Sequence, residues 1–178
     1  EEADGLAWGQ AARDGYVGFV PADGLGEPRP ATHRVRARLS NLYPAADLKT
    51  KPLDVLSLGV ELSGELRDGW LVAPEGAVPA QHLAPAAERE ADWVEVAERF
   101  LGTPYVWGGN SGLGIDCSGL IQVARQAAGF DCPRDSDMQA TLGTGIAPDA
   151  LRRGDLVFWK GHVAVMLDRE RILHANAH

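Results

Sequence analysis

Cysteine, basic charge and long apolar runs are all scarce in this sequence of 178 residues. Its formal net charge is -8 at pH 7, which argues against nucleic acid as a partner because phosphate backbones bind basic surfaces. No apolar run approaches the roughly 20 residues that span a bilayer, so no membrane partner is expected. Cys117 and Cys132 are the only cysteines, too few for a disulfide framework, although a bridge between them is an open alternative.

The hydrophobic fraction of 45% and the charged fraction of 24% are ordinary for a globular protein with a core. The chain begins at Glu1 rather than Met, without a basic-then-apolar leader, and stops at His178 soon after an apolar run. We therefore expect both ends to be trimmed. The expected location is the cytoplasm, or the periplasm or exterior if a leader has been removed.

Residues 1–86 are rich in glycine, proline and short apolar alternations, a pattern typical of short β-strands. An Asp-Gly turn precedes an aromatic residue at Tyr16 and again at Trp70, and each strand leads to Val-Pro-Ala and a closing leucine. This loose repeat resembles the end of a bacterial SH3-type β-barrel. It predicts the end of a first barrel over residues 1–28 and a second barrel over residues 29–86, with coincidental hairpin sequence as the alternative.

The composition changes over residues 87–178. Apolar residues recur at helical spacing within 86–101 and predict a helix there. A second helix is predicted over 117–128, followed by three short strands within 156–175. Helices followed by antiparallel strands indicate an α+β fold.

Cys117 stands at the predicted start of the second helix. The positive end of a helix dipole favours thiolate over thiol, and a thiolate beside an imidazole is a nucleophile for acyl transfer. His162 heads one predicted strand and His174 lies in the next, so both imidazoles can face one side. These residues predict a triad in which Cys117 attacks, His162 is the base and His174 orients His162. The alternative for His174 is a strand-end side chain that only meets water.

A metal site is the competing interpretation of the same residues. His174 and His178 are four residues apart, and the two cysteines and His162 could add ligands. The sequence lacks any Cys-x-x-Cys or His-Glu-x-x-His unit. We therefore expect no metal and no other cofactor.

Five motifs follow one another in the second half of the chain: Leu101–Gly109, Gly114–Ile121, Pro133–Gln139, Arg153–Trp159 and Gly161–Val165. In this order they resemble the NlpC-type cell-wall cysteine peptidases. The N-terminal repeats resemble those of that family's γ-D-glutamyl-L-diamino acid endopeptidases (the dipeptidyl-peptidase VI type). The resemblance implies a papain-like domain over 87–178. It also implies hydrolysis of the γ-D-Glu–diamino acid amide bond in murein peptides with a free N-terminal L-Ala.

The resemblance further implies roles for individual residues. Tyr105 would form part of the oxyanion site beside the nucleophile. Asp116 would bind the free amine of the substrate, and Ser118 and Ser136 would contact its D-Glu. Tyr16, in the first SH3-type region, would close the pocket.

Several of these roles have a structural alternative. Asp116 is also a favourable helix N-cap, and Asp135 with its two neighbours could cap a short helix. Tyr105 and Trp107 could be core aromatics, and Trp159 is expected only to pack. For the whole protein, the alternatives are an acyltransferase on the same scaffold and an inactive module that binds cell-wall peptides.

Overall fold

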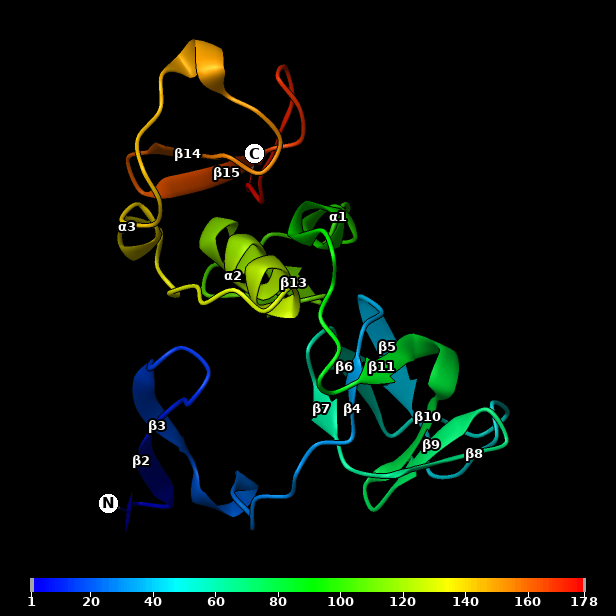
Figure 1. Cartoon of the computed structure of the whole chain (residues 1–178). Coiled ribbons are helices and arrows are strands. Elements are labelled where there is room, and N and C mark those ends of the chain that lie inside the picture. The colour runs from blue at the N-terminus through cyan, green and yellow to red at the C-terminus, as the bar shows by residue number, and fades with distance from the viewer. Residues whose placement is uncertain (1, 178) are drawn as a thin grey trace.

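Figure 1 shows the computed structural model of the chain, which describes residues 2–177. In this view the N-terminal sheet and a middle region of small sheets both lie beneath the C-terminal half, at the lower left and the lower right. The N-terminal sheet is antiparallel in the order β1 (Glu2–Ala3), β2 (Leu6–Gln10), β3 (Val17–Pro21), and is followed by the short 3-10 helix η1 (Ala22–Gly24). Trp8 and Phe19 face each other across β2 and β3, with ring centroids 4.7 Å apart.

The middle region is built from eight short strands in three antiparallel sheets, ordered β10-β9-β8, β11-β4-β7 and β5-β6. Its elements are β4 (His33–Val35), β5 (Leu39–Leu42), β6 (Asp54–Ser57), β7 (Glu61–Leu62), β8 (Glu65–Arg67), β9 (Trp70–Ala73), β10 (Gly76–Pro79), η2 (Ala80–His82) and β11 (Leu83–Pro85). Val35, Leu71 and Val78 are fully buried in a hydrophobic cluster of its own. Barrel closure and the domain boundaries at residues 28 and 86 stay predictions.

The C-terminal half combines helices with one antiparallel sheet, β14-β15-β16. Its elements are α1 (Trp93–Glu98), β12 (Asn110–Ser111), β13 (Gly114–Ile115), α2 (Cys117–Ala127), α3 (Ser136–Gln139), η3 (Pro148–Ala150), β14 (Leu156–Trp159), β15 (His162–Met166) and β16 (Ile172–Leu173). The central helix α2 packs against both α1 and β15, and Ile121, Val163 and Val165 are fully buried in their shared core. The predicted mixture of helix and strand is confirmed.

The first helix, Trp93–Glu98, is shorter than the predicted span 86–101 at both ends, and most of the difference lies at its start. Asp92 caps it by accepting hydrogen bonds from two amides of its first turn, at 2.8 and 3.4 Å. Upstream, the backbone N–H of Glu90 donates to the carbonyl of Ala127 at the end of α2. The expected start at residue 86 was wrong. A helix that began there would need the N–H of Glu90 for its own first turn, but this N–H donates to Ala127 instead.

Arg34 joins the middle region to the C-terminal half. This β4 side chain is only 5% exposed, and it donates to the carbonyls of Glu88 at 3.0 Å and Ala127 at 3.2 Å. Leu58, also from the middle region, belongs to the hydrophobic core of the C-terminal half. The two regions therefore share a packed junction. Within residues 2–177, no helix has the length and apolar character that crossing a bilayer requires.

Candidate active site

Cys117 is the first residue of α2 and is 7% exposed. Asp116 caps the helix, with its Oδ1 accepting from the backbone N–H of Gly119 at 2.7 Å, so the N-cap alternative for Asp116 is confirmed. A Cβ at Gly119 would collide with the carbonyl oxygen of Gly109, so the first turn of α2 can approach this loop only with glycine there. The helix dipole favours the thiolate of Cys117 at this position.

The two predicted histidines lie in contact. His162 begins β15 and His174 follows β16, and Nε2 of His162 is 2.9 Å from Nδ1 of His174. Burial, together with the neighbouring His174, lowers the pKa of His162 below its ordinary value. The ring of Trp159 covers that of His162, with centroids 4.6 Å apart. The neutral imidazole that a general base requires is therefore favoured at His162.

The packing of α2 on β15 brings the helix that carries Cys117 against the strand that carries His162. Among the hydrogen bonds of residues 2–177, none joins Cys117 to a histidine. Since Nε2 of His162 faces His174, Nδ1 is the ring nitrogen left to exchange a proton with a thiol. The catalytic roles of these three residues stay predictions.

Tyr105 pairs with Ile115, two residues before Cys117, through a single parallel β-bridge. Burial first, and then the charges of Cys117 and Asp116, raise the pKa of its phenol. The phenol therefore keeps its proton and can donate a hydrogen bond, as the predicted oxyanion role requires.

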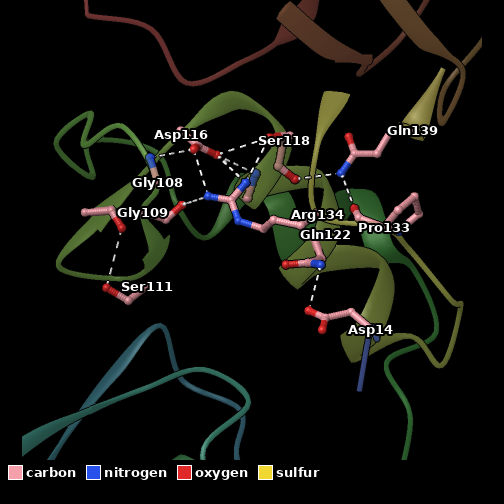
Figure 2. Close-up of polar contacts among 12 residues, drawn as sticks. Asp14, Gly108, Gly109, Ser111, Asp116, Ser118, Gln122, Pro133, Arg134 and Gln139 are labelled. Atoms are coloured by element: carbon pink, nitrogen blue, oxygen red, sulfur yellow. Dashed lines mark hydrogen bonds and ion pairs between the residues drawn. The ribbon is translucent and has the colours of Figure 1, made fainter. Parts of the chain in front are cut away.

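Arg134 forms a two-pronged ion pair with Asp116 (Figure 2). Its Nη1 lies 3.0 Å from Oδ1 and its Nη2 lies 2.8 Å from Oδ2, which also accepts from the backbone N–H of Gly108 at 2.8 Å. Burial alone would raise the pKa of Asp116, but Arg134 and the N–H donors hold it below its usual range. This carboxylate is ionised and already occupied by partners within the protein.

Ser118 and Gln139 extend the same network (Figure 2). The hydroxyl of Ser118 accepts from Nη1 of Arg134 at 2.9 Å, and its carbonyl accepts from Nε2 of Gln139 at 2.9 Å. Gln139 is fully buried and also donates to the carbonyl of Pro133 at 2.8 Å. Neither Arg134 nor Gln139 was predicted as a site residue. The sequence indicated them only as members of the motif Pro133–Gln139.

A cavity of about 770 Å³ separates the N-terminal sheet from the loop before Cys117. Its walls include Asp14, Tyr16, Trp107, Asp116, Arg134 and Asp135. Of the predicted substrate-binding residues, Tyr16 and Asp116 line this cavity, whereas Ser118 and Ser136 do not. Trp107 is 89% exposed, so its interpretation as a core aromatic was wrong. Asp135 precedes α3, but its side chain makes no capping hydrogen bond.

Both cysteines are free thiols, so the disulfide alternative was wrong. Burial raises the pKa of Cys132 to about 11. Within the described residues, no three or more His, Cys, Asp or Glu side chains are grouped so that they could hold a metal ion. His178, which the metal interpretation used, lies outside the described residues.

Comparison with known proteins gives consistent matches. Residues 102–178 match the NlpC/P60 family, and residues 1–25 match the bacterial dipeptidyl-peptidase Sh3 domain. A gamma-D-glutamyl-L-lysine dipeptidyl-peptidase of Bacillus subtilis (strain 168) is 38% identical over 112 residues, which are 58% of this chain and 37% of the relative. Dipeptidyl-peptidase 6 of Lysinibacillus sphaericus is 32% identical over 174 residues, covering 95% of this chain and 62% of the relative. The chain thus spans less than two thirds of either relative.

A crystal structure of an NlpC/P60 family protein from Bacillus cereus ATCC 10987 superposes on 97% of this chain and 68% of that one. The TM-score is 0.78 at 25% sequence identity. The similarity therefore extends over the N-terminal sheet and the middle region as well as the C-terminal half.

Proposed function

We propose that this chain is a cysteine peptidase acting on short murein peptides, because residues 102–178 match the NlpC/P60 family. The bond cleaved is the amide between γ-D-Glu and the diamino acid, in peptides that begin with a free L-Ala. The named dipeptidyl-peptidase relatives support a peptidase of this kind.

The observation that carries the proposal is the position of the large cavity. Asp116, immediately before Cys117, forms part of its wall, and Tyr16, in the turn before β3, forms another part. Cys117 itself does not line the cavity, so in the proposed pose the scissile bond lies at its edge and the amine end of the peptide lies inside. The wall at Tyr16 then limits the length of that end, which favours a short peptide over a polymer. A net charge of -8 is also unsuited to holding anionic wall polymers.

In the proposed mechanism, His162 takes the proton of the Cys117 thiol, and the thiolate attacks the γ-carbonyl carbon of D-Glu. The oxyanion that forms accepts hydrogen bonds from Tyr105 and from backbone amides. Protonated His162 donates its proton to the departing amine of the diamino acid, which leaves a thioester on Cys117. His162 then takes a proton from water, and the hydroxide adds to the thioester carbonyl. The C–S bond breaks, L-Ala-D-Glu leaves, and the Cys117 sulfur takes back the proton from His162. His174 keeps the His162 ring in orientation throughout.

Recognition of the free amine calls for a carboxylate that faces the cavity. Asp116 lies on the wall, but its oxygens already accept from Gly108, Gly119 and Arg134. Asp135 also lines the cavity, and among the hydrogen bonds of residues 2–177 its carboxylate accepts none. We therefore extend the proposal for Asp116 so that Asp135 shares the binding of the substrate ammonium.

The test is incubation with L-Ala-γ-D-Glu-L-Lys and with its meso-diaminopimelate counterpart, followed by chromatography for L-Ala-D-Glu. Release by the wild type and none by Cys117→Ala is expected. Equal release by the Cys117→Ala variant, or no release by the intact protein, would refute a cysteine peptidase of this specificity.

A second assay addresses the amine. N-acetylation of the L-Ala should abolish cleavage, and Asp135→Asn should raise KM. The matched control is Asp137→Asn, two residues away, whose side chain is exposed on α3 and lies outside the cavity wall. Unchanged cleavage of the acetylated peptide would refute recognition of the amine. An equal rise in KM in the two variants would refute a specific role for Asp135.

A further inference from the structure

Asp14 lies in the turn between β2 and β3, and its two carboxylate oxygens have different partners. Oδ1 accepts from the backbone N–H of Tyr16 at 3.1 Å, within the turn itself. Oδ2 accepts from Nε2 of Gln122 at 3.1 Å (Figure 2). The adjacent Gly15 has φ +72°, a conformation that glycine adopts without strain. One side chain thus orders its own turn and reaches across to α2.

Gln122 is a rigid partner for this contact. It lies in α2, the helix that Cys117 begins, and it is fully buried. The same Nε2 also donates to the carbonyl of Cys132 at 3.2 Å, so both amide hydrogens have acceptors and the amide is fixed in orientation. Asp14 therefore contacts a point that is fixed relative to the nucleophile.

Little else holds the N-terminal sheet in place. Across residues 2–177, the contact between Asp14 and Gln122 is the one hydrogen bond that joins β1–β3 or their turns to the C-terminal half. Most large apolar side chains of this sheet are exposed, including Trp8, Val17 and Phe19. With so little apolar burial, a hydrogen bond to a charged acceptor makes a large contribution to docking.

The same turn supplies part of the cavity wall. Asp14 and Tyr16 line the cavity, together with Asp116 and Arg134 from the C-terminal half. Oδ1 of Asp14 binds the backbone N–H of Tyr16 while Oδ2 binds α2, so this one carboxylate connects Tyr16 to the helix that Cys117 begins.

We propose that Asp14 is a positioning residue that latches the N-terminal sheet onto α2 and so keeps Tyr16 in the cavity wall. The effect on substrate rests on the proposed function. In that case the latch determines the affinity for the peptide and leaves the rate of the chemical steps unchanged. An unlatched sheet lowers the fraction of molecules competent to bind, and the apparent affinity falls by that fraction.

The test compares Asp14→Ala with Asp23→Ala, both in the full chain. Asp23 lies in η1, just after β3, and is exposed, so its removal changes charge equally without touching the latch. For L-Ala-γ-D-Glu-L-Lys, Asp14→Ala should raise KM about tenfold with kcat within about twofold of wild type, and Asp23→Ala should change neither. A loss in kcat equal to the loss in kcat/KM, or equal effects of both variants, would overturn the role in affinity.

Hydrogen exchange tests the latch without any activity. In Asp14→Ala, amides of β2 and β3 should exchange about tenfold faster than in wild type, while those of α2 stay unchanged. Unchanged exchange in β2 and β3 would overturn the latch. Failure of the wild type to cleave the peptide, combined with faster exchange in Asp14→Ala, would refute the proposed function and leave the latch supported.

Discussion

At the scale of single residues, Cys117 and Cys132 are both nearly buried, yet their surroundings differ. Cys117 begins α2, where the helix dipole favours its thiolate. Cys132 lies in the core beyond the other end of that helix, and burial raises its pKa to about 11. The sequence could single out Cys117 from its place before a helical pattern, but nothing in the sequence showed that Cys132 would be inert.

Alkylation should therefore distinguish the two thiols. At pH 8, a thiol of pKa about 11 is only about 0.1% ionised, so iodoacetamide should modify Cys117 and leave Cys132 unmodified in the folded protein. Peptide mass spectrometry measures both sites. Labelling of Cys132 at the rate of Cys117 would contradict this expectation.

Arg134 should be important for stability as well as for the site. Arg134→Ala leaves the buried Asp116 charge without its cation, which should lower the free energy of unfolding by about 3–5 kcal/mol. Arg134→Lys keeps the charge but loses the two-pronged geometry, so an intermediate loss is expected. Urea unfolding measures both variants.

The control for Arg134 is Arg171→Ala, which removes an exposed arginine paired with Asp168 and should leave stability nearly unchanged. An Arg134→Ala protein as stable as the wild type would show that Asp116 does not need its partner.

At the scale of elements, β15 and β16 determine how the two histidines meet. The pairs Val165 with Leu173 and Met166 with Ile172 set their register, and this register brings His174 to His162. Short apolar runs separated by a turn predicted these strands, because strand periodicity is a local property. The ion pair between Asp116 and Arg134 joins residues 18 positions apart, and no local pattern indicates such a pairing.

Substitutions of His174 test its predicted orienting role. His174→Ala should lower kcat/KM by about 10²–10⁴-fold, and His174→Asn should lose less because an amide can still hydrogen-bond to the His162 ring. Steady-state kinetics on the peptide measure this difference. Equal losses in the two variants would show that His174 does not act through a hydrogen bond.

At the scale of the whole molecule, pH dependence follows from the environment of the histidine pair. The pKa of His162 is lowered by burial and by His174, so its neutral, basic form persists below its ordinary value of about 6.5. The acidic limb of kcat/KM should therefore have its midpoint below pH 6.5. In His174→Asn the neighbouring charge is gone, so the midpoint should move upward; a downward shift or no shift would contradict this coupling.

The junction at Arg34 has a practical consequence for protein engineering. A gene fragment encoding only residues 87–178 would lack the guanidinium that binds the carbonyls of Glu88 and Ala127, and it would lack the Leu58 side chain in the core. Unpaired carbonyls and a missing core residue both reduce stability. We therefore expect residues 87–178 to be unstable on their own. A fusion of the C-terminal half to another binding domain should include the middle region as well.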